Sequence, residues 1–123
     1  MSAGHGVRVL LADDDADVRA ALADLLAADP RVSVVGVAAE GSTAARIAEQ
    51  DLPDVAVVDV RMPDGGSELV RRLVASGVAV ICFSADGASR AAMLDAGAHA
   101  FVAKGDRIPD LVQVIRAAVA IRD

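Results

Sequence analysis

The sequence has little cysteine, few cations and no long apolar segment, and each shortage excludes a class of protein. Its single cysteine, Cys82, has no partner for an intrachain disulfide. Twelve Lys and Arg residues against 18 Asp and Glu give a net charge of −6 at pH 7, whereas nucleic-acid binding requires clustered cations. No apolar run approaches the ~18 residues of a membrane span, and the N-terminus turns acidic at Asp13, where a signal peptide would remain apolar. We therefore expect a cytoplasmic chain with a reduced thiol, no membrane segment and no direct contact with nucleic acid.

The sequence also lacks linkers, low-complexity segments and the glycine patterns of nucleotide-binding loops. Gly4 and Gly6 precede the first expected strand instead of following it, so we expect no P-loop or dinucleotide site. The 123 residues, with 54% hydrophobic and 24% charged side chains, have the composition of a globular domain. A chain of this length buries roughly two-thirds of its unfolded surface, which is enough for a core without disulfides. We expect one domain, residues 1–123, without an output domain.

Five short apolar runs, each followed by a helical pattern, predict the fold. The runs are apolar throughout, which is typical of parallel strands covered on both faces: Val7–Ala12, Val32–Ala38, Val55–Val58, Val78–Phe83 and Ala100–Ala103. Helices are expected at about Ala16–Ala28, Ser42–Gln50, Gly66–Ser76, Ala88–Ala96 and Asp110–Arg122. Asp15 and Ser42 are the expected N-caps of the first two helices. The alternation predicts an α/β fold with an open, doubly wound, flavodoxin-like sheet of five parallel strands in the order 2-1-3-4-5.

Polar residues follow the central strands of this predicted sheet. Asp13 and Asp14 follow the first strand, Asp59 the third, Ser84 the fourth, and Lys104, the only lysine in the chain, the fifth. The carboxyl ends of parallel strands share one edge, and ligands bind there at the switch point between the first and third strands. Three carboxylates suit a hard divalent ion such as Mg²⁺. A lysine and a hydroxyl suit an anion such as phosphate, and a carboxylate is the available nucleophile.

The residues at these strand ends form motifs that are similar to those of a known family. From Val7 to Ile121 the chain resembles a response-regulator receiver domain of bacterial two-component systems, in the branch that carries helix-turn-helix output domains. The motifs are Leu10-Leu11-Ala12-Asp13-Asp14, Val57-Val58-Asp59-Val60-Arg61-Met62-Pro63-Asp64-Gly65, Phe83-Ser84-Ala85 and Phe101-Val102-Ala103-Lys104. Each motif is weakly specific alone, but their order and spacing together are highly specific.

The resemblance implies a phosphorylation site with bound Mg²⁺. Asp59 would be the phosphoacceptor that forms an aspartyl phosphate with a phosphoryl group from a sensor histidine kinase. Asp14, Asp59 and the backbone carbonyl of Arg61 would bind Mg²⁺ directly, and Asp13 would act mostly through water. The chain would catalyse only its own phosphorylation and dephosphorylation, and would not be an enzyme with an external substrate.

The resemblance also implies a conformational switch that controls an output, most often transcription. Ser84 and Lys104 would each contact a phosphoryl oxygen, and Phe101 would be an aromatic switch whose rotamer follows Ser84. The fourth helix, fifth strand and fifth helix would form a surface that binds a second copy or an output domain. The last helix supports this hypothesis because its apolar residues occupy more than one side.

Several alternatives remain open at this stage. Asp13 and Asp14 are also suited to a helix-capping turn, Ser84 to a loop cap, and Phe101 equally to a plain core position. A Mg²⁺-dependent phosphatase or phosphotransferase would use Asp59 as its nucleophile, although such enzymes usually have an acid where Arg61 stands. A pseudo-receiver scaffold would lack one of the five site residues.

Two features bear on how such a site would behave. Many family members have proline after the site lysine, often with a cis peptide, whereas Gly105 follows Lys104 here. This glycine removes a backbone constraint from the loop. Arg61 and Asp86 are expected to flank the path of an attacking water and to influence the lifetime of the phosphoryl group.

Overall fold

Five parallel strands alternate with five α-helices along the chain. The computed structural model describes residues 6–85, 87–105 and 108–122. The strands are β1 (Val7–Ala12), β2 (Val32–Ala38), β3 (Val55–Val58), β4 (Ala79–Ser84) and β5 (Ala100–Ala103). The helices are α1 (Ala16–Ala27), α2 (Gly41–Asp51), α3 (Ser67–Ala75), α4 (Arg90–Asp95) and α5 (Ile108–Arg122), with a short 3₁₀ helix, η1 (Gly87–Ser89), before α4. Four strands have the predicted bounds, and β4 is displaced by one residue.

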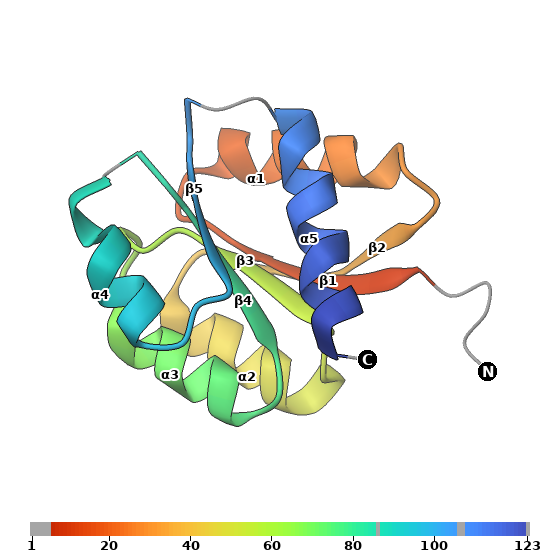
Figure 1. Cartoon of the computed structure of the whole chain (residues 1–123). Helices are drawn as coiled ribbons and strands as arrows, with labels where there is room; N and C mark the ends of the chain where they lie inside the picture. The colour runs from red at the N-terminus through yellow and green to blue at the C-terminus, as the bar shows by residue number, and fades with distance from the viewer. Residues whose placement is uncertain (1–5, 86, 106–107, 123) are drawn as a thin grey trace.

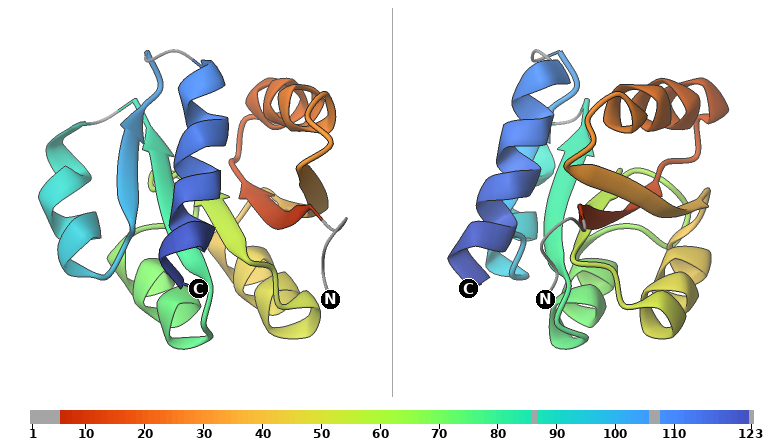
Figure 2. Two further views of the ribbon diagram at one scale, coloured as in Figure 1. Left: turned by 45° about the vertical axis from the view of Figure 1, so that its right-hand side comes forward. Right: turned by 90° about the vertical axis from the view of Figure 1, so that its right-hand side faces the viewer.

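The strands form one sheet in the order β2-β1-β3-β4-β5, and every neighbouring pair is parallel. Helices α1 and α5 cover one face of the sheet, and α2, α3 and α4 cover the other (Figure 1, Figure 2). This arrangement confirms the predicted doubly wound fold. Among the described residues, no helix is long and apolar enough to cross a bilayer.

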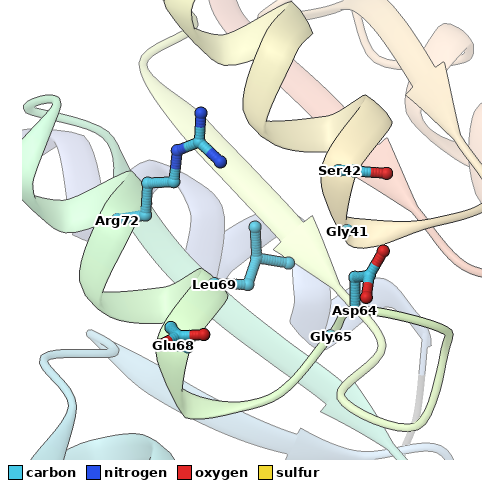
Figure 3. Close-up of a pocket in the computed structure, with 7 residues that line it drawn as sticks. All are labelled: Gly41, Ser42, Asp64, Gly65, Glu68, Leu69 and Arg72. Atoms are coloured by element: carbon cyan, nitrogen blue, oxygen red, sulfur yellow. The ribbon is translucent and has the colours of Figure 1, made fainter.

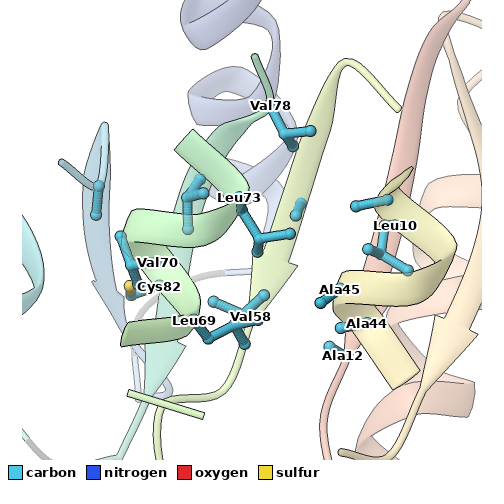
Figure 4. Packing of buried hydrophobic residues seen from close by; sticks show 14 of the residues in the cluster. Leu10, Ala12, Ala44, Ala45, Val58, Leu69, Val70, Leu73, Val78 and Cys82 are labelled. Atoms are coloured by element: carbon cyan, nitrogen blue, oxygen red, sulfur yellow. The ribbon is translucent and has the colours of Figure 1, made fainter. Parts of the chain in front are cut away.

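Alternation along the strands distributes the apolar side chains between two cores. In β1, Val9 and Leu11 face α1 and α5, whereas Leu10 and Ala12 face α2 and α3. Figure 4 shows the second core, where Leu10 packs with residues of β3, α2 and α3. Because successive side chains point to opposite faces, this alternation also determines the face on which each residue beyond a strand end emerges.

The helix starts differ from the sequence-based predictions at α2, α4 and α5, and by one residue at α3, which begins at Ser67 after Gly66. Helix α2 is preceded by Glu40 and has no side-chain cap, so the predicted cap at Ser42 is wrong. The N–H of Gly41 donates instead to the carbonyl of Pro63 at 2.7 Å. Helix α4 begins at Arg90 because η1 precedes it. Helix α5 begins at Ile108, two residues before the predicted start, and therefore includes Pro109 in its first turn, where proline is well tolerated.

The predicted cap of α1 is confirmed. Asp15 lies before the helix in an extended conformation, and its Oδ1 accepts hydrogen bonds from the N–H groups of Asp17 at 2.9 Å and Val18 at 3.3 Å. These bonds satisfy two of the donors that every helix leaves free at its N-terminus. The cap thereby fixes the turn that carries Asp13 and Asp14.

Candidate functional site

Three aspartates meet at the carboxyl ends of β1 and β3. Asp13 continues the α1/α5-facing row of β1, and Asp59 continues the same row of β3, where its N–H donates to the carbonyl of Ala12 at 2.9 Å. Asp13 is 2% exposed and Asp59 is 5% exposed, whereas Asp14 points to solvent. One carboxylate oxygen from each of the three lies within 4.8 Å of the others. The fold therefore joins residues that are 45 positions apart in the sequence into one acidic cluster.

Backbone groups orient the two buried carboxylates. Oδ1 of Asp13 accepts a hydrogen bond from the N–H of Asp15 at 2.9 Å, and Oδ1 of Asp59 accepts one from the N–H of Arg61 at 3.0 Å. Arg19 on α1 donates from Nη1 to the carbonyl of Asp13 at 2.7 Å and holds the same turn. One oxygen of each buried carboxylate is thus fixed by the loop that follows it, and the other oxygen faces Lys104.

Lys104 bridges the two buried carboxylates. Its Nζ lies 2.9 Å from Oδ2 of Asp13 and 3.2 Å from Oδ2 of Asp59, and its side chain is 23% exposed. Burial lowers the pKa of Lys104, but its hydrogen bonds to and attraction by Asp13 and Asp59 outweigh burial and raise the pKa above its usual value. Lys104 is therefore cationic at neutral pH.

The donor set of the acidic cluster fits a divalent cation. Asp13, Asp14 and Asp59 with Lys104 carry three negative charges and one positive charge, which leaves −2 on these four side chains. Carboxylate oxygens are the ligands that Mg²⁺ takes in proteins, and an exposed Asp14 leaves room for the waters that Mg²⁺ usually retains. A single Mg²⁺ would balance this charge.

Ser84 and Phe101 belong to the face of the sheet opposite to that of Asp13 and Asp59. Ser84 ends β4, is fully buried and follows Val80 and Cys82 in the row that faces α2, α3 and α4. Its carbonyl accepts a hydrogen bond from the N–H of Lys104 at 3.0 Å, so the ends of β4 and β5 are joined next to the cluster. The ring of Phe101 is buried in the same core, and its carbonyl accepts a bond from Nη1 of Arg90 at 3.3 Å.

Sequence analysis found the ionic residues of the site but missed two neighbours. Arg19 was not singled out, although its place one turn inside α1 would have suggested contact with the preceding loop. Phe83 was noted only as part of a motif, yet the ammonium of Lys104 lies over its ring, 5.7 Å from the centroid. Arg61 is exposed, and Asp86 lies outside the described residues.

A separate pocket lies between α2 and α3 (Figure 3). It has a volume of about 260 Å³ and is lined by Gly41, Ser42, Asp64, Gly65, Glu68, Leu69 and Arg72. None of these residues belongs to the acidic cluster. Arg72 beside it forms an exposed ion pair with Glu49 at 2.9 Å. We assign this pocket no part in the site at the strand ends.

Comparison with known proteins gives consistent matches over almost the whole chain. The family model of the response regulator receiver domain matches residues 9–116. The chain is 38% identical over 119 residues to the transcriptional regulatory protein PdtaR of Mycobacterium tuberculosis, covering 92% of this chain and 57% of PdtaR. It is 41% identical over 115 residues to the DNA-binding transcriptional activator DevR/DosR of the same species, covering 89% of this chain and 53% of DevR/DosR. The chain thus spans about half the length of these curated relatives.

Solved structures agree with these matches. The signal receiver domain of the response regulator NarL from M. tuberculosis has a TM-score of 0.87 and 28% identity, covering 94% of this chain and 97% of that chain. The response regulator domain of CheB from Thermotoga maritima has a TM-score of 0.86 and 29% identity, covering 94% and 98%. The similarity covers almost the whole chain.

Proposed function

This chain belongs to the response regulator receiver domain family, and from that membership we propose that it is a phosphorylation-controlled switch of a two-component system. Residues 1–123 constitute one receiver domain, and Asp59 accepts a phosphoryl group from a sensor histidine kinase in the cytoplasm. The observation that carries this proposal is the cluster of Asp13, Asp14 and Asp59 within 4.8 Å, bridged by Lys104. A purely capping role for Asp13 and Asp14 would not require a partly buried lysine that bridges Asp13 and Asp59.

Asp59 is the nucleophile in this proposal. Its Oδ1 is held by the N–H of Arg61, so Oδ2 is the oxygen that faces the centre of the cluster. Attack by Oδ2 forms a new P–O bond while the P–N bond of the phosphohistidine breaks and its electron pair remains on the imidazole. Transfer of this kind depends mainly on positioning and on neutralising the phosphoryl oxygens. Lys104 supplies one positive charge beside the attacking oxygen.

Asp13, Asp14, Asp59 and the backbone carbonyl of Arg61 would hold Mg²⁺. When bound, Mg²⁺ supplies positive charge that reduces repulsion between the carboxylates and the incoming phosphoryl group. The buried carboxylates contribute fixed oxygens, because Asp13 and Asp59 each use Oδ1 in a backbone hydrogen bond. Asp14 is exposed and can turn toward the site without breaking a core contact.

Ser84 and Lys104 connect the phosphorylated state to the surface of the protein. Ser84 is fully buried, so its hydroxyl reaches a phosphoryl oxygen on Asp59 only if the end of β4 and the loop before α4 shift. The hydrogen bond from the N–H of Lys104 to the carbonyl of Ser84 transmits that shift to β5. Phe101 is the switch residue whose rotamer follows Ser84. The hydrogen bond from Arg90 to the carbonyl of Phe101 connects β5 to α4. The output is a change in the surface made by α4, β5 and α5, which binds a second copy or an output domain and thereby controls transcription.

The test is intact mass after incubation with acetyl phosphate, with Mg²⁺ and with EDTA, for the wild type and Asp59→Asn. We expect a gain of one phosphoryl group that requires Mg²⁺ and is absent from the variant. No gain in the wild type would contradict the proposal and favour a scaffold. Release of many equivalents of phosphate per chain would instead favour the phosphatase alternative.

A further inference from the structure

Phe83 occupies a position between the phosphoacceptor and its lysine. Val58 of β3 pairs with Cys82 of β4, so the next residues, Asp59 and Phe83, lie at neighbouring places. Both belong to the side-chain rows that face α1 and α5. Strands of a sheet are about 4.8 Å apart, and β5 is separated from β3 by β4. The side chain of Lys104 must therefore pass the end of β4, where Phe83 lies, to reach Asp59 and Asp13.

The contact between Lys104 and Phe83 has the geometry of a cation–π interaction. Nζ of Lys104 lies over the Phe83 ring, 5.7 Å from its centroid, within the ~6 Å over which such contacts are attractive. A hollow of about 160 Å³ is lined by Val18, Ala21, Leu22, Phe83 and Lys104. Of these five residues only Lys104 is charged, so its methylene stem runs along an apolar wall while its ammonium reaches the carboxylates.

The backbone after Lys104 supplies little restraint. Gly105 is exposed, and a Cβ at this position would meet nothing within 4 Å. Many receivers have proline after this lysine, and proline would fix the backbone there. The backbone of Lys104 is held by its N–H bond to the carbonyl of Ser84, and the ammonium is held by the two carboxylates and the Phe83 ring.

We propose that Phe83 is a positioning residue that holds the Lys104 ammonium across β4, against Asp13 and Asp59, and thereby sets the rate of phosphoryl transfer. The effect on rate rests on the proposed function, whereas the placement of Lys104 does not. Phe83 has no charge or polar group to offer the phosphoryl group, so its effect on transfer goes through the lysine. Without the ring, Lys104 divides its time between the carboxylates and solvent, and the site loses positive charge.

The placement is tested by NMR on protein labelled with ¹³C only in lysine. Lys104 is the only lysine, so its ε-methylene gives a single resonance, which the Phe83 ring shifts upfield. We expect this shift to disappear in Phe83→Leu and to persist in Phe83→Tyr. Phe101→Leu is the matched control, because Phe101 is the only other aromatic residue and its ring lies in the core on the opposite face. An unchanged resonance in Phe83→Leu would overturn the proposal.

The effect on rate is tested with acetyl phosphate and Mg²⁺ on four proteins, the wild type, Phe83→Leu, Phe83→Met and Phe83→Tyr, after urea unfolding has shown that each variant is folded. We expect Phe83→Leu to be phosphorylated roughly threefold to tenfold more slowly, the range that corresponds to losing one such contact. Phe83→Met, which keeps the volume but not the ring, should be equally slow, and Phe83→Tyr should recover most of the rate. Equal rates for all four proteins would overturn the proposal. If the wild type takes up no phosphoryl group, the proposed function fails, and the NMR signal still decides whether the Phe83 ring lies against Lys104.

Discussion

At the scale of single residues, burial dominates the chemistry of Cys82. The thiol lies in β4 with no exposed surface, in the core that faces α2 and α3. Burial raises its pKa from the ordinary value of 9.0 to about 12. The unfolded chain therefore ionises at a lower pH than the folded chain. The contribution of the protonated thiol to stability is fully present below pH 9 and is lost as the pH rises toward 12.

This pKa shift predicts that the unfolding free energy falls at alkaline pH. At about pH 10 the wild type should lose about 1.4 kcal/mol of unfolding free energy relative to pH 8 through Cys82. Cys82→Ala should lack this loss, although its baseline stability is lower because of the cavity. Urea unfolding of both proteins at the two pH values measures the difference. The sequence has no tyrosine and only one lysine, so few other side chains titrate there. Equal pH dependence of the two proteins would contradict the prediction.

The ionic residues of the site were predictable one by one, but their contacts were not. Asp13, Asp59 and Lys104 each follow an apolar run, and the common edge of a parallel sheet brings such residues together. The atoms that come into contact are determined by side-chain direction and strand order. The bridge from Lys104 to both buried carboxylates, and the ring of Phe83 beneath it, therefore became visible only in three dimensions.

At the scale of elements, the loop after Asp59 is held by the start of α2. Gly41 donates its N–H to the carbonyl of Pro63, and a Cβ on Gly41 would overlap the carbonyl of Asp64. Asp64 itself has a left-handed φ of 58°, so this loop has little freedom to move aside. The requirement for glycine at residue 41 thus comes from the approach of two backbones.

Gly41→Ala is predicted to destabilise the protein by about 2 kcal/mol or more, because the overlap is with backbone and cannot be relieved by a side-chain rotation. Urea unfolding measures this loss. Gly87→Ala is the matched control, since a Cβ at Gly87 would meet nothing within 4 Å, and its stability should change by less than about 0.5 kcal/mol. Equal effects of the two substitutions would show that the α2 contact is not rigid.

The strands were predicted more accurately than the helix starts for a physical reason. A strand that is buried on both faces has a continuous apolar run in the sequence, as in Val55–Val58. The start of α2 depends instead on Gly41 and Pro63, which are 22 residues apart in the sequence. The start of α4 depends on the η1 turn before it, and nothing in the local pattern distinguishes that turn from the helix.

At the scale of the whole molecule, the structure buries part of the apolar surface of α5 on which the predicted partner surface of α4, β5 and α5 rested. The apolar character of α5 on more than one side suggested an exposed apolar face. Its large apolar residues Leu111 and Ile115 are fully buried, and the described exposed positions of α5 include Gln113 and Arg116. Among the side chains that the structure describes on these three elements, the exposed large apolar residue is Leu94 of α4, at 36%. We therefore expect Leu94 to contribute to partner binding.

We expect the unphosphorylated protein to be monomeric and the phosphorylated protein to associate weakly through this surface. With a net charge of −6 at pH 7, two copies repel one another. Phosphorylation adds about −1 more, because an acyl phosphate with a charge of about −2 replaces a carboxylate. Charge therefore opposes association, and a dimer would have to arise from rearrangement of α4 and β5 around Leu94. Burying this one side chain and few others suggests a dissociation constant on the order of 10⁻⁵ M.

Sedimentation velocity in about 0.15 M salt, where repulsion is screened beyond roughly 8 Å, measures this association with and without acetyl phosphate and Mg²⁺. Leu94→Ser should weaken the phosphorylated dimer about tenfold, because it removes apolar area worth about 1.4 kcal/mol. Val37→Ser is the matched control: Val37 is 49% exposed on β2, at the opposite edge of the sheet from β5. It should leave the dimer unchanged. A monomer in both states at high concentration would argue against self-association and would leave an output domain as the partner of this surface.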